Sequence, residues 1–241
     1  GNQTENVITK TLNGQLSSVF QSGSGPITTP DPPIINDNNV IAFSAAHLGR
    51  VIAVLPPGRP LMLISASPGP FQSFSSYPAL NDADSLAFTA GLSTGGQGIF
   101  VKTGNTFNPI VDTTGAFASL SDPSINTLGD VAFWATLDSG GEGIYTGTDI
   151  IADKVIQTGD SLLGAAVRRV NFFRGLNNNG QIAFYAETSN GVQGIYRADP
   201  VIVQPPLPTP IPEPSTWLLL ASGMIGLLSY RCGRWRGHAS K

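Results

Sequence analysis

The chain has 241 residues, of which 12% are charged, and it contains 28 glycines and 19 prolines. This composition favours turns and extended segments over long surface helices, and the length suits one large all-β domain or two small ones. Residues 1–199 carry 9 lysines and arginines against 15 aspartates and glutamates. Because an acidic domain without a basic stripe repels phosphate backbones, we expect no nucleic-acid partner.

The single cysteine, Cys232, lies near the end of the chain. Residues 1–200 can therefore form neither an internal disulfide nor a cysteine zinc site. The sequence starts at Gly1 without an early apolar run, so a signal peptide or further repeats could precede it.

One eight-residue pattern recurs four times, and its copies start 45, 45 and 51 residues apart. The copies begin at an asparagine and end at a phenylalanine: Asn36 to Phe43, Asn81 to Phe88, Asn126 to Phe133 and Asn177 to Phe184. A period in the mid-forties is the length of one four-stranded propeller blade. The repeat therefore predicts a tandem β architecture.

The end of each copy alternates at period two, which predicts a strand with one apolar face. The opposite face carries a small residue in every copy, and this favours very close packing by a second sheet. The residues in question are Ala42, Ala87, Ala132 and Ala183.

A partner strand follows in the last three copies, around Ile99, Ile144 and Ile195. The connection contains a glycine at one fixed offset, as a hairpin turn with positive φ requires; these are Gly95, Gly140 and Gly191. A further strand is expected at 110–112 and 155–157, whereas the first copy is degenerate after Ala45.

The two ends of this region complement one another. Residues 7–23 align loosely with 99–115, and the fourth copy stops after its second strand at Tyr196. Joined, the ends would complete a blade and close a ring of four, the smallest propeller. We therefore predict an all-β, β-propeller-like domain of four-stranded repeats over residues 1–200. A fragment of a larger ring and a curved open array are the alternatives.

The composition changes after residue 200. Residues 201–216 are Pro-rich and predict an extended linker, residues 217–230 lack charge and predict a short hydrophobic helix, and residues 231–241 form a basic tail. Arg231, Arg234 and Arg236 would hold that end in the cytoplasm and leave the repeats outside. Fourteen apolar residues are fewer than the ~20 of a stable span, so we expect transient membrane insertion.

Pro212, Glu213 and Pro214, followed by the apolar segment and the arginines, resemble the PEP-CTERM sorting signal of Gram-negative bacteria. This resemblance implies an exosortase-type enzyme as partner, processing near the Pro-Glu-Pro motif, and a membrane-inserted precursor that ends at the cell surface or outside the cell.

The eight-residue units in turn resemble the NxxGxxAF tandem repeats of exported bacterial proteins. Asn39 and Asp84 replace the glycine in two units, and both residue types tolerate left-handed backbone. That resemblance implies no activity.

Two patterns could carry catalysis. Residues 91–95 fit the Gly-x-Ser-x-Gly nucleophile elbow, but the elbow requires a strand-to-helix turn and a histidine, and this segment falls in a predicted hairpin. His47 is the only histidine in residues 1–200, and a solvated loop histidine is the favoured interpretation.

Two further groups could bind ligands. Trp134 and Tyr185 occupy the same repeat position and could stack on sugar rings, although packing between blades is the favoured interpretation. Calcium is a weak expectation at the acidic turns, where turn formation is favoured because no EF-hand order is present; these acids are Asp37, Asp82, Asp84 and Asp130. No other cofactor or metal is expected.

These features predict a non-enzymatic exported surface or matrix protein, sorted by an exosortase system and binding exopolysaccharide. The alternative is a secreted carbohydrate-active enzyme with paired carboxylates, since a glycosidase needs only two acids at a suitable separation. The sequence does not determine that separation.

Overall fold

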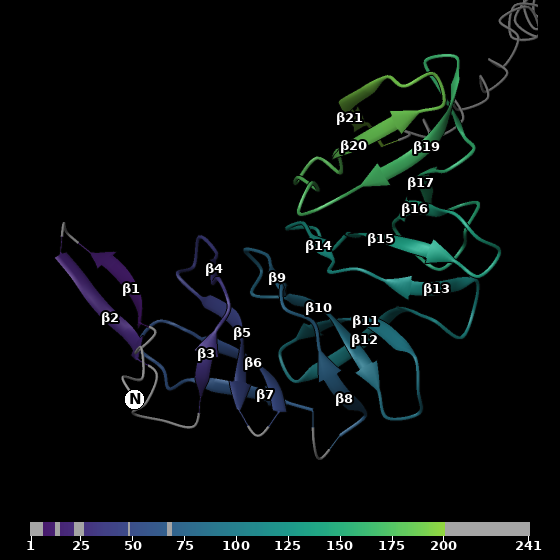
Figure 1. Cartoon of the computed structure of the whole chain (residues 1–241). Coiled ribbons are helices and arrows are strands. Elements are labelled where there is room, and N and C mark those ends of the chain that lie inside the picture. The colour runs from purple at the N-terminus through teal and green to yellow at the C-terminus, as the bar shows by residue number, and fades with distance from the viewer. Residues whose placement is uncertain (1–6, 13–14, 22–26, 48, 67–68, 201–241) are drawn as a thin grey trace, which may run out of the picture. The chain divides into compact units, whose positions relative to one another are not determined.

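The computed structural model describes residues 7–12, 15–21, 27–47, 49–66 and 69–200 (Figure 1). Every regular element in these ranges is a β-strand, and every pairing between strands is antiparallel. The prediction of an all-β domain is therefore confirmed. The chain divides into two units at Pro200. The expected linker, hydrophobic helix and basic tail lie outside the described residues.

Four sheets follow one another along the chain, and each runs through four strands in sequence order. The first contains β3 (Thr28–Pro30), β5 (Ile41–His47), β6 (Gly49–Leu55) and β7 (Met62–Ser65). The second contains β8 (Phe71–Phe74), β10 (Leu86–Leu92), β11 (Gln97–Thr103) and β12 (Thr106–Asp112). The third contains β13 (Phe117–Leu120), β15 (Val131–Leu137), β16 (Glu142–Tyr145) and β17 (Lys154–Gln157).

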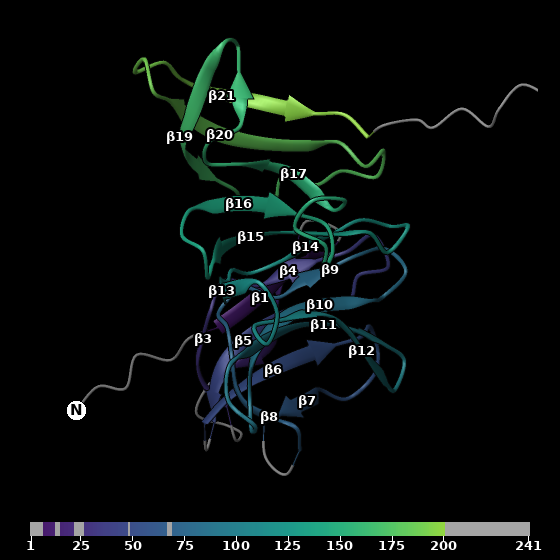
Figure 2. The same ribbon diagram turned by 90° about the vertical axis from the view of Figure 1, so that its right-hand side faces the viewer.

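The fourth sheet contains β18 (Ser161–Leu162), β19 (Ala165–Asn171), β20 (Ile182–Thr188) and β21 (Gln193–Ala198). Short strands pair beside the main path of the first three sheets: β4 (Ile34–Ile35), β9 (Ala79–Leu80) and β14 (Ser124–Ile125). Figure 2 shows these sheets layered one on another.

Two expectations need correction. The first unit is not degenerate, because β6 and β7 complete its sheet and Ile52 pairs with Ser44 just as Ile99 pairs with Thr89. The segment around residues 7–23 does not complete the fourth sheet by strand pairing. It forms β1 (Val7–Leu12) and β2 (Gln15–Gln21), which make a separate two-stranded sheet.

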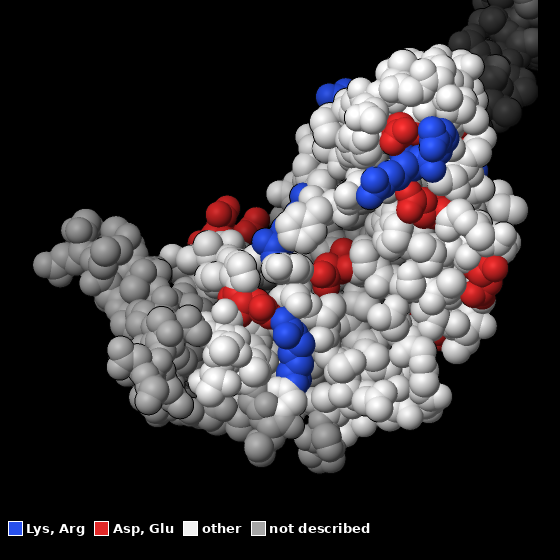
Figure 3. All heavy atoms as spheres, viewed as in Figure 1, with Lys and Arg blue, Asp and Glu red and all other residues white. Residues whose placement is uncertain are grey.

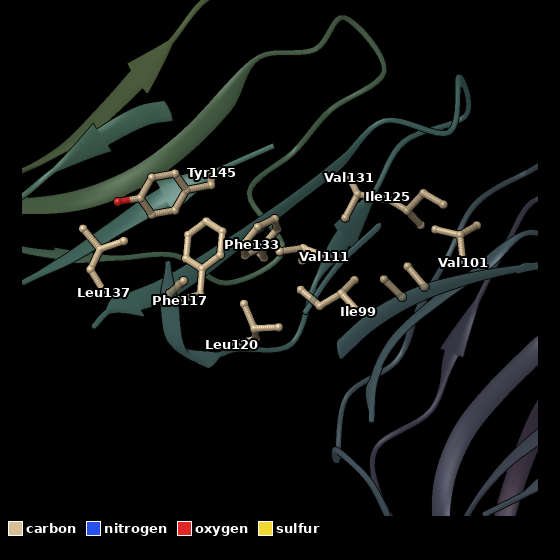
Figure 4. Packing of buried hydrophobic residues seen from close by; sticks show 13 residues of the cluster. Ile99, Val101, Val111, Phe117, Leu120, Ile125, Val131, Phe133, Leu137 and Tyr145 are labelled. Carbon is tan, nitrogen blue, oxygen red and sulfur yellow. The ribbon is translucent and has the colours of Figure 1, made fainter. Parts of the chain in front are cut away.

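The hydrophobic core lies between consecutive sheets. The phenylalanine of each repeated strand is buried, at 0, 0, 0 and 6% exposure for Phe43, Phe88, Phe133 and Phe184. Three clusters join the alanine face of one sheet to the phenylalanine face of the next, as Ile99 packs with Phe117 and Phe133 (Figure 4). Aromatic rings meet edge to face there, with 5.7 Å between the centroids of Phe117 and Phe133.

The outer face of the fourth sheet departs from this pattern. Ala42, Ala87 and Ala132 are fully buried, whereas Ala183 is exposed. Likewise Ile195 is 77% exposed, although Ile144 at the same repeat position is fully buried. No described residue covers this face as each following sheet covers the one before it.

The asparagine that starts each unit bonds within its own turn, and in the first three units it also bonds to the next unit. Its Oδ1 accepts from the main-chain N–H four residues later, at 2.8 Å for Asn81 and Ser85. The left-handed position of the turn has positive φ in all four units, as expected: Asn39, Asp84, Gly129 and Gly180. These turns fix the entry to β5, β10, β15 and β20.

Candidate functional site

A polar groove lies between the third and fourth sheets. It has a volume of about 540 Å³ and is lined by residues from β16, β19 and β20 and from the adjoining turns: Gly141, Glu142, Thr158, Arg168, Arg169 and Glu187. Figure 3 shows acidic and basic side chains gathered over β16 and β19. The two arginines and two glutamates balance, so the groove suits a neutral ligand better than a strongly charged one.

Glu142 connects the two sheets that form the groove. The Glu142 Oε1 accepts a hydrogen bond from the Val170 N–H at 2.8 Å, which ties β16 to β19. The Glu142 N–H donates to the Thr158 hydroxyl at 3.2 Å. On the opposite wall Arg168 Nη1 lies 3.7 Å from Glu187 Oε1, a distance typical of a weak surface ion pair.

Trp134 stands beside this groove. A second cavity, of about 240 Å³, shares Glu142 and Arg169 with the groove and is also lined by Trp134, Ser121 and neighbouring residues. The indole packs, half-buried, against the core between the third and fourth sheets. Its Nε1 is buried without a hydrogen-bond partner among the described residues. Since a buried indole N–H usually has an acceptor, this unsatisfied donor distinguishes Trp134 from the other residues that line the cavity.

Tyr185 and Trp134 do not form one aromatic surface. Residues alternate between faces along β20, so Phe184 enters the core while Tyr185 lies on the opposite side with the exposed Ala183. Trp134 belongs to the buried interface and Tyr185 to the uncovered end face. The two equivalent aromatic residues are therefore separated by the fourth sheet.

The acidic turns bond to each other and to the neighbouring turns. Asp82 Oδ1 accepts from the Asp37 N–H at 3.0 Å, and Asp84 Oδ1 accepts from the side chain of Asn36 at 2.6 Å. Asp130 accepts from the Asn126 side chain within its own turn. In the described part of the chain no group of three or more histidine, cysteine or acidic side chains could hold a metal ion.

The residues considered for nucleophilic catalysis do not form an elbow. Residues 91–95 close the hairpin between β10 and β11, where Gly95 has a φ of 96° and the Ser93 N–H donates to the Pro70 carbonyl. No helix follows them in the described residues. His47 ends β5 opposite Gly49, and its side chain lies outside what the structure describes.

Sequence reasoning missed the groove itself. Glu142 and Glu187 come from different repeats and carry no shared motif, so only the packing of β16 against β19 brings them together. One sequence feature does point to the groove. Arg168 and Arg169, which both line it, are the only adjacent pair of cationic residues before residue 200.

Two protein-family models match separate segments of the chain. Residues 65–200 match a family model described as a family of unknown function, DUF7453. The chain belongs to the DUF7453 family. Residues 210–234 match the PEP-CTERM protein-sorting motif. No curated protein matches the sequence.

The sorting motif gives this DUF7453 protein a destination. It supports exosortase-dependent sorting, export, and a location at the cell surface or outside the cell. Pro212, Glu213, Pro214 and Arg231 fall inside the matched range, whereas Arg234 ends it and Arg236 lies beyond it. All of them lie outside the described residues. Among the described residues no helix is long and apolar enough to cross a membrane.

Proposed function

We propose that this DUF7453 protein is a non-enzymatic component of the bacterial surface or extracellular matrix, and that its repeat domain binds exopolysaccharide. The observation that carries the proposal is that Trp134 lines a cavity that adjoins a charge-balanced groove. Neutral polysaccharides present hydroxyl donors and acceptors on apolar rings, and an aromatic residue beside polar side chains suits both. Export by the sorting motif would bring the domain to such polymers.

The proposed architecture is a β-propeller-like array of NxxGxxAF-type repeats. Four consecutive four-stranded sheets with cores between their faces support it. Closure into a ring would require that a further sheet cover Ala183 and Ile195.

For the tail we propose processing near Pro212, Glu213 and Pro214 after transient insertion of residues 217–230, with Arg231, Arg234 and Arg236 setting the orientation.

Binding of the full chain to exopolysaccharide from exosortase-carrying bacteria tests the proposed function. Affinity electrophoresis should show retardation by the polymer, with calcium and with a chelator as parallel arms. Trp134→Ala should weaken binding by about tenfold or more, as for an aromatic side chain at the centre of an interface. Trp134→Phe keeps an aromatic ring in the core but removes the N–H together with the rest of the five-membered ring, so it compares partial with complete truncation of the indole.

Tyr185→Ala is the matched control, because Tyr185 has the same repeat position but lies on the other side of the fourth sheet. Equal losses from Trp134→Ala and Tyr185→Ala, or no retardation of the wild-type chain, would contradict binding in the groove.

A carbohydrate-active enzyme is the second candidate, because Glu142 and Glu187 line one groove. A glycosidase of this kind would release reducing ends from the polymer, and Glu142→Gln would abolish the release. Release by the wild-type chain that is lost in Glu142→Gln would replace the binding proposal with the enzymatic one.

A further inference from the structure

Strand β21, at the outer edge of the fourth sheet, differs from the corresponding strands of the other three sheets. In those sheets the third strand pairs with a fourth strand, and Ile52, Ile99 and Ile144 each face a residue 12 positions later along the chain. By repeat position β21 corresponds to β6, β11 and β16, with Ile195 in the place of these isoleucines. Among the described residues no strand pairs with the other side of β21.

The sequence after β21 does not predict the fourth strand at the spacing that the other repeats use. The residue 12 positions after Ile195 is Leu207, which stands between Pro206 and Pro208. Proline has no N–H to donate to a strand ladder, so prolines on both sides disfavour a strand at this position. The outer side of β21 therefore offers main-chain N–H and C=O groups to a strand from elsewhere.

This edge also lacks the features that protect exposed sheet edges from pairing. At the ends of the four sheets, six of the other seven outer strands have four residues or fewer, and the seventh, β12, contains Pro109. Strand β21 has six residues, contains neither proline nor lysine, and pairs with β20 without a bulge. Its Ile195 is 77% exposed. A long, regular and apolar edge of this kind is a template for another chain.

The side chains of β21 suit a second copy of the same strand. Arg197 is the only charged residue of β21, and its Nε lies 3.0 Å from Asp199 Oδ1. If two β21 strands pair antiparallel with Ile195 opposite Ile195 of the second copy, each Arg197 faces Gln193 and not another arginine. Glu187 lies beside Gln193 on β20, so each Arg197 approaches a carboxylate of the other copy. The pairing thus has an apolar centre and sets no like charges opposite each other.

We propose that β21 is an association edge at which two copies of the chain pair antiparallel about a two-fold axis, so that their fourth sheets form one continuous sheet. Main-chain hydrogen bonds join the two edges, and the alternate side chains set the register. A two-fold pairing covers both edges at once, as a closed interface requires. No residue of β21 lines the groove or the cavity beside Trp134, so this pairing can fail without affecting the proposed function.

Sedimentation velocity of the full chain in detergent, over a range of concentrations, tests the association. The wild type should form a reversible dimer. Ile195→Lys places two ammonium groups opposite each other at the centre of the pairing and should weaken the dimer by about tenfold or more. Because Ile195 is exposed, this variant should fold, and its melting temperature checks that. Ile151→Lys is the matched control, since it adds the same charge at a residue that is 81% exposed between β16 and β17, and its dimer should persist.

A cysteine crosslink reports the register of the pairing. Cys232 is the only cysteine of the chain, so Cys232→Ser provides the background. In it Ile195→Cys should give a disulfide-linked dimer on mild oxidation, because directly opposite residues of antiparallel strands lie within reach of a disulfide. Gln193→Cys is the control on the same face of β21, and it should crosslink poorly because it lies away from the two-fold axis.

Three results would overturn the proposal. The first is a monomeric wild type, as expected if residues of the same chain or an unrelated extended peptide cover the edge. The second is a dimer that Ile195→Lys leaves unchanged, as expected if residues 217–230 alone hold the copies together. The third is crosslinking of Ile195→Cys that is no stronger than that of Gln193→Cys, since a different register or a head-to-tail contact would then join the copies.

Discussion

Asn81 and Asn126, which begin successive repeats, are joined by a hydrogen bond in which Asn81 Nδ2 donates to the Asn126 carbonyl at 2.8 Å. Asn36 donates to the Asn81 carbonyl in the same way at 2.9 Å, and Asn126 donates to the Asn177 carbonyl at 3.3 Å. The ladder stops at Asn177, whose amide donates to Gln181 in its own turn. The asparagine thus closes its own turn and connects adjacent sheets.

Asn81→Ala should destabilise the repeat domain by about 1–3 kcal/mol, because it leaves a buried carbonyl and two turn N–H groups without their partner. Asn177→Ala is the matched control. It removes the same side chain at an exposed position with no following repeat, and should cost less. Urea unfolding of both variants compares them, and equal losses would show that the bond between repeats contributes nothing.

Phe133→Ala should destabilise the domain by roughly 3–5 kcal/mol, since it removes a fully buried ring from the core between the second and third sheets. Phe173→Ala removes an equal volume from a ring that is 58% exposed and should change stability little. Thermal unfolding provides the comparison. A loss below about 1 kcal/mol for Phe133→Ala would mean that the ring is not part of the core.

Ile144→Ala should cost about 2–5 kcal/mol as a large-to-small change in the core, whereas Ile195→Ala should be nearly neutral. The two residues share a repeat position and differ only in whether a following sheet covers them. Denaturant midpoints of the two variants therefore report on closure. If Ile195→Ala were as costly as Ile144→Ala, the end face would be covered, as a closed ring requires.

Asp122 predicts a specific pH dependence. Burial in the folded state raises its pKa above the usual 3.8, so folded protein holds this proton more tightly than unfolded protein. Ionisation of Asp122 therefore lowers the free energy of unfolding as pH rises from about 4 through the raised pKa. Acidification restores that free energy. Unfolding free energies of wild type and Asp122→Asn between pH 3 and 7 should differ increasingly in favour of the variant as pH rises. A difference that grows in favour of the wild type would contradict this assignment.

The tail predicts a shortened mature protein. Chain recovered from the native cell surface should lack the residues beyond about Pro214, and neutral replacements of Arg231, Arg234 and Arg236 should weaken membrane retention of the precursor. Intact-mass analysis and fractionation measure these outcomes, with folding of the repeats as the internal control. A surface-bound chain that still ends at Lys241 would make residues 217–230 a permanent anchor.

The sequence by itself determined the strands and their hydrophobic faces. Period-two alternation around Phe88 and Phe133, and a glycine at a fixed offset such as Gly140, are local patterns that depend only on backbone geometry. The sorting motif was equally visible, because Pro212, Glu213 and Pro214 stand next to one another. Local and contiguous signals of this kind do not depend on the tertiary structure.

Only the tertiary structure decided which faces are covered and which side chains meet. Ala132 and Ala183 have the same local sequence context, yet one is buried and the other exposed, because burial depends on whether a further sheet follows. Arg50, Tyr77 and Phe173 come from three repeats and carry no shared pattern, so no periodicity could bring them together. The layered sheets bring the segments after β8 and β19 to one side, where Arg50 donates to Ser76 and the Tyr77 ring meets that of Phe173.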